Sequence, residues 1–91
     1  MKTISIKTTP KFEKSFSGLP KLIQKEAVKK KAIFSQNPFV PELKTHKLAG
    51  KLRTLWSFSI NYSYRVLFEF TAKNKVLFHD VGTHRIYKRG E

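Results

Sequence analysis

The pattern of apolar and polar residues predicts a short strand and two helices in the first part of the chain. Residues 4–7 alternate with the period of a strand. Thr9 before Pro10 is typical of a helix start, because threonine accepts a hydrogen bond from the first turn and proline fits there. Gly18 is a typical helix end. A second helix is predicted at about residues 20–36, which makes a helical hairpin.

The second predicted helix has an apolar side and a basic side. The apolar side consists of Leu22, Ile23, Ala27, Ile33 and Phe34. Lys21, Lys25 and Lys29 lie on the other side, and we name these three residues the lysine ridge. Glu26 and Lys30 interrupt the apolar side at a spacing that favours an ion pair. The ridge is therefore either an ordinary solvated surface or part of a footprint for a polyanion.

Three strands are predicted after a basic, irregular connection over residues 39–51. Alternation marks residues 55–62 and 64–70, and a third strand is predicted at residues 76–81, after the turn at residues 72–75. The short connections favour an antiparallel meander. A three-residue loop between the first two strands places Ser57, Ser59 and Arg65 on one face, opposite the aromatic side chains. A two-residue loop would mix the two faces.

These elements together predict a single α+β domain over residues 1–91. Their order is an N-terminal strand, a helical hairpin and then a curved antiparallel sheet, β-α-α-β-β-β. No internal repeat divides the chain.

Charge limits the classes of partner. The chain has 19 Lys and Arg against 6 Asp and Glu, a formal net charge of +13. Nucleic acid is the first expected partner, an acidic protein the second and an anionic membrane the third. The absence of cysteine excludes disulfides and thiolate metal sites. No signal peptide and no run of about 20 apolar residues is visible, so we expect a soluble, cytoplasmic protein without a membrane partner.

Arg65 is the first candidate for chemistry, because it stands in a strand among aromatic and aliphatic residues. A guanidinium in that position needs a partner or a solvent-filled groove. The structural interpretation either pairs it with Glu69 on the same face or packs its aliphatic stem over the edge of the sheet. The functional interpretation is a phosphate clamp, since the planar fork of arginine matches phosphate oxygens.

The other candidates are His84, Tyr87 and His46. His84 follows the last predicted strand, where loops display functional groups, and histidine transfers protons near neutral pH. An isolated surface histidine more often has no role than a catalytic one. For His84 the nearby Tyr87 and Arg85 favour the catalytic interpretation. The basic residues near these candidates are Lys44, Lys47, Lys51, Arg53, Arg85 and Lys88. The three histidines are too far apart, and acidic residues too few, for a metal site, so we expect neither a metal nor another cofactor.

Four segments in this order resemble the RelE/ParE superfamily of bacterial toxins, most closely its RelE- and YafQ-like messenger-RNA interferases. They are residues 46–52 (HKLAGKL), 55–60 (LWSFSI), 64–68 (YRVLF) and 81–84 (VGTH). The resemblance covers nearly the whole chain. It implies the RelE-like α+β fold and an endoribonuclease that cuts messenger RNA, usually on the ribosome and without a metal. In that reaction the 2′-hydroxyl attacks the phosphate and a 2′,3′-cyclic phosphate forms.

The resemblance also assigns roles to the candidates. Arg65 matches the arginine that stabilises the phosphate, and His84 matches a histidine used as acid or base. His46 matches a further histidine of the YafQ-like site, and Tyr87 a C-terminal aromatic that stacks or hydrogen-bonds there. The sequence departs from relatives at Ser57, Ser59, Ser63 and Arg85, so which residue is the general base and which the acid stays open.

The resemblance also implies three partners. One is a cognate antitoxin, expected here to be a small acidic protein, and the other two are messenger RNA and the ribosome with its RNA. Two alternatives remain at this point. One is a ParE-like toxin that inhibits DNA gyrase without cutting RNA, and the other is a non-catalytic RNA-binding module.

Overall fold

A computed structural model describes residues 3–89, with side chains as far as Tyr87. A five-stranded sheet has the strand order β1-β5-β4-β3-β2. In chain order the elements are β1 (Ser5–Thr8), α1 (Pro10–Ser17), α2 (Lys21–Gln36), the 3-10 helix η1 (Pro41–Leu43), β2 (His46–Lys47), the 3-10 helix η2 (Gly50–Leu52), β3 (Trp56–Ser59), β4 (Arg65–Ala72), β5 (Lys75–Gly82) and α3 (Ile86–Arg89).

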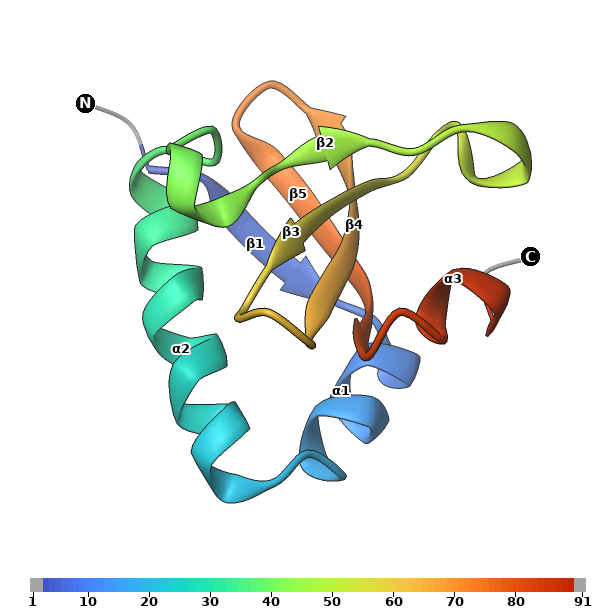
Figure 1. Cartoon of the computed structure of the whole chain (residues 1–91). Helices are drawn as coiled ribbons and strands as arrows, with labels where there is room; N and C mark the ends of the chain where they lie inside the picture. Colours follow the sequence, from blue (N-terminus) through green and yellow to red (C-terminus); the bar gives the residue numbers. More distant parts are fainter. Residues whose placement is uncertain (1–2, 90–91) are drawn as a thin grey trace.

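The sheet is mixed, because a strand whose pairing the sequence left open joins the predicted meander in parallel. β3, β4 and β5 form the predicted meander, but β1 runs parallel to β5. Parallel neighbours need a long connection, and the helical hairpin begins that connection as it leaves β1 (Figure 1). The connection at residues 39–51 also holds β2, a two-residue edge strand that alternation is too short to reveal.

The register of β3 and β4 confirms the three-residue loop. Phe58 lies opposite Val66 and Ser59 lies opposite Arg65. The amide of Ile60 donates to the carbonyl of Tyr64 at 2.9 Å, which closes the loop around residues 61–63. Directly opposite residues share a face, so Ser57, Ser59 and Arg65 lie together, away from the aromatic core.

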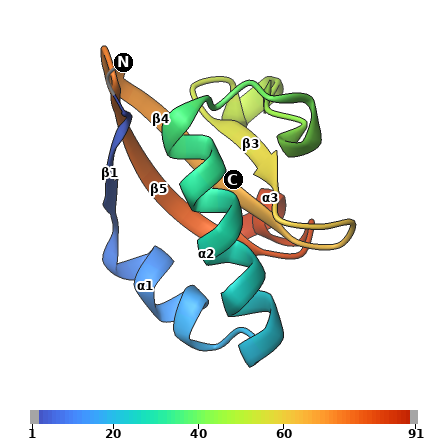
Figure 2. The same cartoon turned by 90° about the vertical axis from the view of Figure 1, so that its left-hand side faces the viewer.

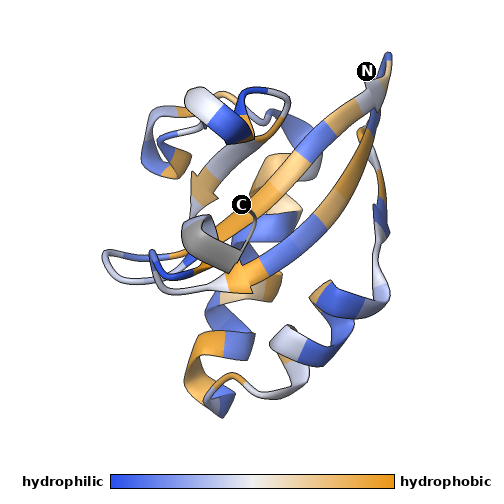
Figure 3. Cartoon of the chain, turned by 90° about the vertical axis from the view of Figure 1, so that its right-hand side faces the viewer, coloured by the Kyte–Doolittle hydropathy of each residue, from blue (hydrophilic) through white to orange (hydrophobic). Residues whose placement is uncertain are grey.

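The core lies between the helices and one face of the sheet, where α2 crosses in front of the strands in Figure 2. Phe34 is its centre, fully buried, with its ring centroid 4.7 Å from that of Phe58 and 4.9 Å from that of Phe68. Figure 3, seen from the opposite side, shows apolar and polar residues following one another along the strands, with α2 behind the sheet. Leu22 does not belong to the core: it is 70% exposed, because it lies on the first turn of α2.

The predicted Glu26–Lys30 ion pair is wrong. Lys30 Nζ binds Glu42 Oε2 at 2.8 Å, because η1 folds back against α2. Glu26 Oε1 instead accepts a hydrogen bond from Asn61 Nδ2 at 3.3 Å. Glu42 therefore joins η1 to α2, and Glu26 joins α2 to the β3–β4 loop.

Candidate nucleic-acid cleavage site

The β3–β4 loop and the β5–α3 loop meet at one end of the sheet and form an open groove of about 640 Å³. They meet because Arg65, the first residue of β4, lies opposite Gly82, the last residue of β5. The residues that line the groove are Tyr62, Ser63, Arg65, Thr83, His84 and Arg85. Two residues that are 19 positions apart in the sequence, Arg65 and His84, thus lie in the same groove.

The loop beside Arg65 holds its guanidinium. The expected pair with Glu69 does not form. Its Nη1 donates to the carbonyls of Asn61, Tyr62 and Tyr64 at 2.7, 3.0 and 3.2 Å. Glu69 Oε1 instead accepts a hydrogen bond from His79 Nε2 at 2.6 Å. Within residues 3–89, Arg65 Nε and Nη2 have no hydrogen-bond partner. One edge of the guanidinium therefore fixes the loop, and the other retains two donors for a phosphate.

His84 is exposed in the turn between β5 and α3. The turn is fixed by the amide of Ile86, which donates to the Thr83 carbonyl at 3.0 Å, and by that of Tyr87, which donates to the His84 carbonyl at 3.1 Å. Ile86 is fully buried and anchors the turn on the sheet. The backbone around His84 is thus held in place while the imidazole stays open to a ligand in the groove.

Tyr87 and His46 flank Ser57 on the same face of the sheet. The Tyr87 hydroxyl lies 3.0 Å from Ser57 Oγ, and either oxygen can be the donor. His46 is directly opposite Ser57 in the β2–β3 pair, so its side chain lies on the Ser57 face. Ser57 itself is fully buried. The structure therefore brings Tyr87 and His46 to one serine, while Arg65 and His84 line the groove.

The tautomer of neutral His46 follows from its hydrogen bond. Its Nδ1 lies 2.9 Å from the carbonyl oxygen of Lys44. A carbonyl only accepts, so Nδ1 carries the hydrogen and Nε2 of the neutral ring has the lone pair. His46 is exposed, and Nε2 can accept a proton from a substrate on this face.

Four of the predicted phosphate-binding residues lie along the exposed connection before β3: Lys44, Lys47, Lys51 and Arg53. Arg85 lines the groove beside His84. Lys88 lies in α3, but its side chain is outside the part that the structure describes. The sequence did not indicate the positions of Tyr62 and Thr83 in the groove, because only the register of the two loops brings them there.

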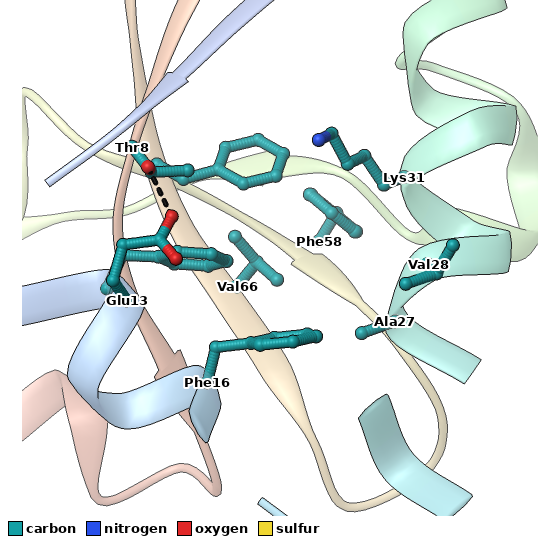
Figure 4. A pocket seen from close by; sticks show the side chains of 10 residues that line it. Thr8, Glu13, Phe16, Ala27, Val28, Lys31, Phe58 and Val66 are labelled. Atoms are coloured by element: carbon teal, nitrogen blue, oxygen red, sulfur yellow. Dashed lines mark hydrogen bonds between the residues drawn. The ribbon is translucent and has the colours of Figure 1, made fainter. Parts of the chain in front are cut away.

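Two other cavities lack this combination of groups. A pocket of about 230 Å³ opens between α1 and α2, and Figure 4 shows Phe16, Ala27 and Val28 around it, a mostly apolar lining. A second cavity, of about 410 Å³, holds the Glu69–His79 pair and the buried Asp80. Asp80 is satisfied within the fold, since Ser15 Oγ donates to it at 2.7 Å.

A metal site and a membrane-spanning helix are both missing from the described part of the chain. No group of three His, Asp or Glu residues stands together there as metal ligands. None of the helices in residues 3–89 is long and apolar enough to cross a bilayer.

Known structures share this arrangement of elements. A chain of the RelBE2 toxin-antitoxin complex from Mycobacterium tuberculosis superposes with a TM-score of 0.76 and 18% identity, over 90% of this chain and 99% of that one. The chain has the fold of RelE-type toxins. YafQ from Escherichia coli gives a TM-score of 0.72 at 17% identity, over 92% of this chain and 97% of its own.

The RelE-type fold alone does not select one activity. A YoeB/ParE toxin from Agrobacterium tumefaciens matches with a TM-score of 0.73 and 13% identity, over 89% of this chain and 99% of that one. No family model and no curated protein sequence matches the chain. The structural matches therefore show the RelE-type fold alone.

Proposed function

We propose that the protein is the toxin component of a type II toxin-antitoxin system and a metal-independent endoribonuclease that cuts messenger RNA on the ribosome. The observation that carries the proposal is the groove shared by Arg65 and His84. A guanidinium with two open donors binds the phosphate, and a nearby imidazole transfers protons.

The reaction needs only groups that the chain and RNA supply. The 2′-oxygen of the substrate loses its proton and bonds to phosphorus. The bond from phosphorus to the 5′-oxygen then breaks, and that oxygen gains a proton. The products are a 2′,3′-cyclic phosphate and a free 5′-hydroxyl. DNA lacks the nucleophile, so the mechanism is selective for RNA.

Arg65 has the electrostatic role. Negative charge grows on the non-bridging oxygens as the fifth bond to phosphorus forms, and Nε and Nη2 stabilise it. Loss of one such donor typically lowers the rate constant by about 10²–10³-fold. His84 exchanges a proton with the 2′- or the 5′-oxygen, a contribution on the order of 10²–10⁴ in rate. His46 Nε2 and the Tyr87 hydroxyl are the candidates for the complementary proton transfer.

The partners follow from the charge and from the neighbours of the fold. The solved relatives include the RelBE2 complex and a DinJ–YafQ complex, each a toxin with its antitoxin. A chain with a net charge of +13 suits a small acidic antitoxin. The same charge favours ribosomal RNA when the antitoxin is absent.

The test is to map RNA ends in a translation reaction and after brief induction in cells. We expect wild type to cut the message, and Arg65→Ala and His84→Ala each to lower the cleavage rate at least about 100-fold. Lys73→Ala is the matched control, because Lys73 is an exposed cation in the β4–β5 turn, at the other end of β4. Intact message with wild type, together with gyrase-dependent DNA breaks, would replace this proposal by the ParE-like one.

A further inference from the structure

Tyr62 is the most exposed large apolar side chain recorded in residues 3–89, at 92%, and it stands at the edge of the Arg65 groove. We propose that Tyr62 is a platform on which a base of single-stranded RNA stacks, next to the phosphate held by Arg65. The inference rests on the proposed function and adds the site that recognises the base. Every nucleobase has an apolar face, so an open aromatic ring beside a phosphate site can bind RNA through stacking.

Several hydrogen bonds hold the loop that displays Tyr62. Asn61 Oδ1 accepts hydrogen bonds from the amides of Ser63 and Tyr64, each at 2.9 Å. The Asn61 side chain also donates to Glu26 on α2, and Arg65 Nη1 holds the carbonyl of Tyr62 itself. Because the backbone of the loop is already held by these bonds, it loses little conformational entropy when a ligand binds to the Tyr62 ring. The exposure of Tyr62 is therefore a property of a fixed loop and not of a loose one.

The surroundings of Tyr62 favour RNA over an apolar protein partner. The other exposed large apolar side chains are Leu22, Val28 and Phe39. The first two are on α2, and the Phe39 ring stacks on Phe70 with centroids 6.0 Å apart. The Tyr62 ring has no aromatic neighbour within residues 3–89, and the groove beside it holds Arg65, His84 and Arg85. Cations beside one open ring match the alternation of phosphate and base in a single strand.

The experiment separates binding from cleavage with a short 2′-O-methyl RNA oligonucleotide that carries 2-aminopurine. The methyl group blocks the nucleophile, so the oligonucleotide binds without being cut. The fluorescence of 2-aminopurine falls when it stacks on an aromatic ring. Wild type, Tyr62→Phe and Tyr62→Leu are titrated with this oligonucleotide and with an equally charged version that lacks the base. Thr71→Val, a change at an exposed threonine of β4 outside the groove, serves as the control.

We expect wild type and Tyr62→Phe to quench the fluorescence and to bind within about twofold of each other. Tyr62→Leu keeps apolar bulk but loses the ring, so it should bind the intact oligonucleotide at least about fivefold more weakly. All variants, including Thr71→Val, should bind the abasic version equally, and Thr71→Val should also bind the intact oligonucleotide like wild type. Equal affinity of Tyr62→Leu and wild type for the intact oligonucleotide, or absence of quenching by wild type, would overturn the proposal. So would an equal loss on the intact and abasic versions.

The translation reaction keeps this outcome separate from the proposed function. If wild type cuts the message and Tyr62→Leu cuts it at the same rate and positions, the endonuclease stands and the stacking site falls. If wild type stacks the base through Tyr62 but leaves the message intact, the stacking site stands and the endonuclease falls.

Discussion

At the scale of single residues, Arg65 both holds the β3–β4 loop and is the residue that we propose to bind the phosphate. Nη1 is used by three carbonyls of the β3–β4 loop, while Nε and Nη2 face no partner within residues 3–89. Lysine could supply the positive charge, but its compact ammonium could not bind the loop carbonyls on one edge and a phosphate on the other, as the planar guanidinium can. The two roles of Arg65 can therefore be separated by measuring stability and cleavage in the same variant.

Arg65→Lys should lose cleavage and a smaller amount of stability. We expect the rate in a translation reaction to fall at least about 100-fold, because the fork for the phosphate is gone. The free energy of unfolding in urea should fall by about 1–2 kcal/mol, because some loop carbonyls lose their donor. Lys73→Ala, the exposed control, should change neither. A wild-type rate in Arg65→Lys would mean that charge alone serves the site.

The hydrogen bond between Tyr87 and Ser57 is the second residue-scale contact to test, because it fixes α3 on the face of the sheet. Ser57→Ala, Tyr87→Phe and the double variant form a thermodynamic cycle. We expect a coupling of about 0.5–1.5 kcal/mol between the two positions in urea unfolding. If the losses of unfolding free energy in the two single variants simply add up in the double variant, the hydrogen bond between the two hydroxyls contributes nothing beyond their hydrogen bonds with water. Cleavage by Tyr87→Phe then reports separately whether the hydroxyl takes part in proton transfer.

At the scale of elements, local signals could be predicted from the sequence and long-range pairings could not. Thr9, Pro10 and Gly18 mark both ends of α1 as expected, because caps act within one turn. The parallel pairing of β1 with β5 was missed, since it depends on how the hairpin packs and not on either strand's own pattern. β2 was missed because a two-residue strand has no period.

The cap of α1 also ties the helix to β5, and this predicts a larger effect than for an ordinary cap. Thr9 Oγ1 accepts from the Phe12 amide at 3.0 Å and donates to the His79 carbonyl at 3.0 Å. Thr9→Val keeps the shape but removes both bonds, so the free energy of unfolding in urea should fall by about 2 kcal/mol. Thr71→Val, at an exposed threonine of β4, should change it by less than about 0.5 kcal/mol. Equal effects at the two positions would contradict the double role.

At the scale of the whole molecule, the candidate site is assembled by the register of the sheet. Arg65 and His84 could be named from the sequence, because a strand arginine and a histidine after a strand are unusual in themselves. Their shared groove depends on the pairing of Arg65 with Gly82. Tyr62 could not be singled out among three tyrosines, since its exposure depends on how the β3–β4 loop is closed.

The net charge of +13 leads to a prediction about the surface far from the groove. The lysine ridge of α2 is exposed along its length, at Lys21, Lys25 and Lys29. If these lysines contact ribosomal RNA, replacing all three by glutamine should lower the salt dependence of ribosome binding. The slope of log K against log salt should become smaller by about 2–3, because each contact releases close to one counterion.

A second triple variant separates the position of charge from its amount. Lys7, Lys73 and Lys75 are exposed near the other end of β4 and β5, and their change to glutamine gives the same net charge. We expect this variant to keep nearly the wild-type slope, since counterions are released only where phosphates approach. If the slope of log K against log salt falls equally in both triple variants, ribosome binding depends on total charge and the lysine ridge is an ordinary solvated surface. If only the ridge variant does, α2 is a docking surface that presents the Arg65 groove to the message.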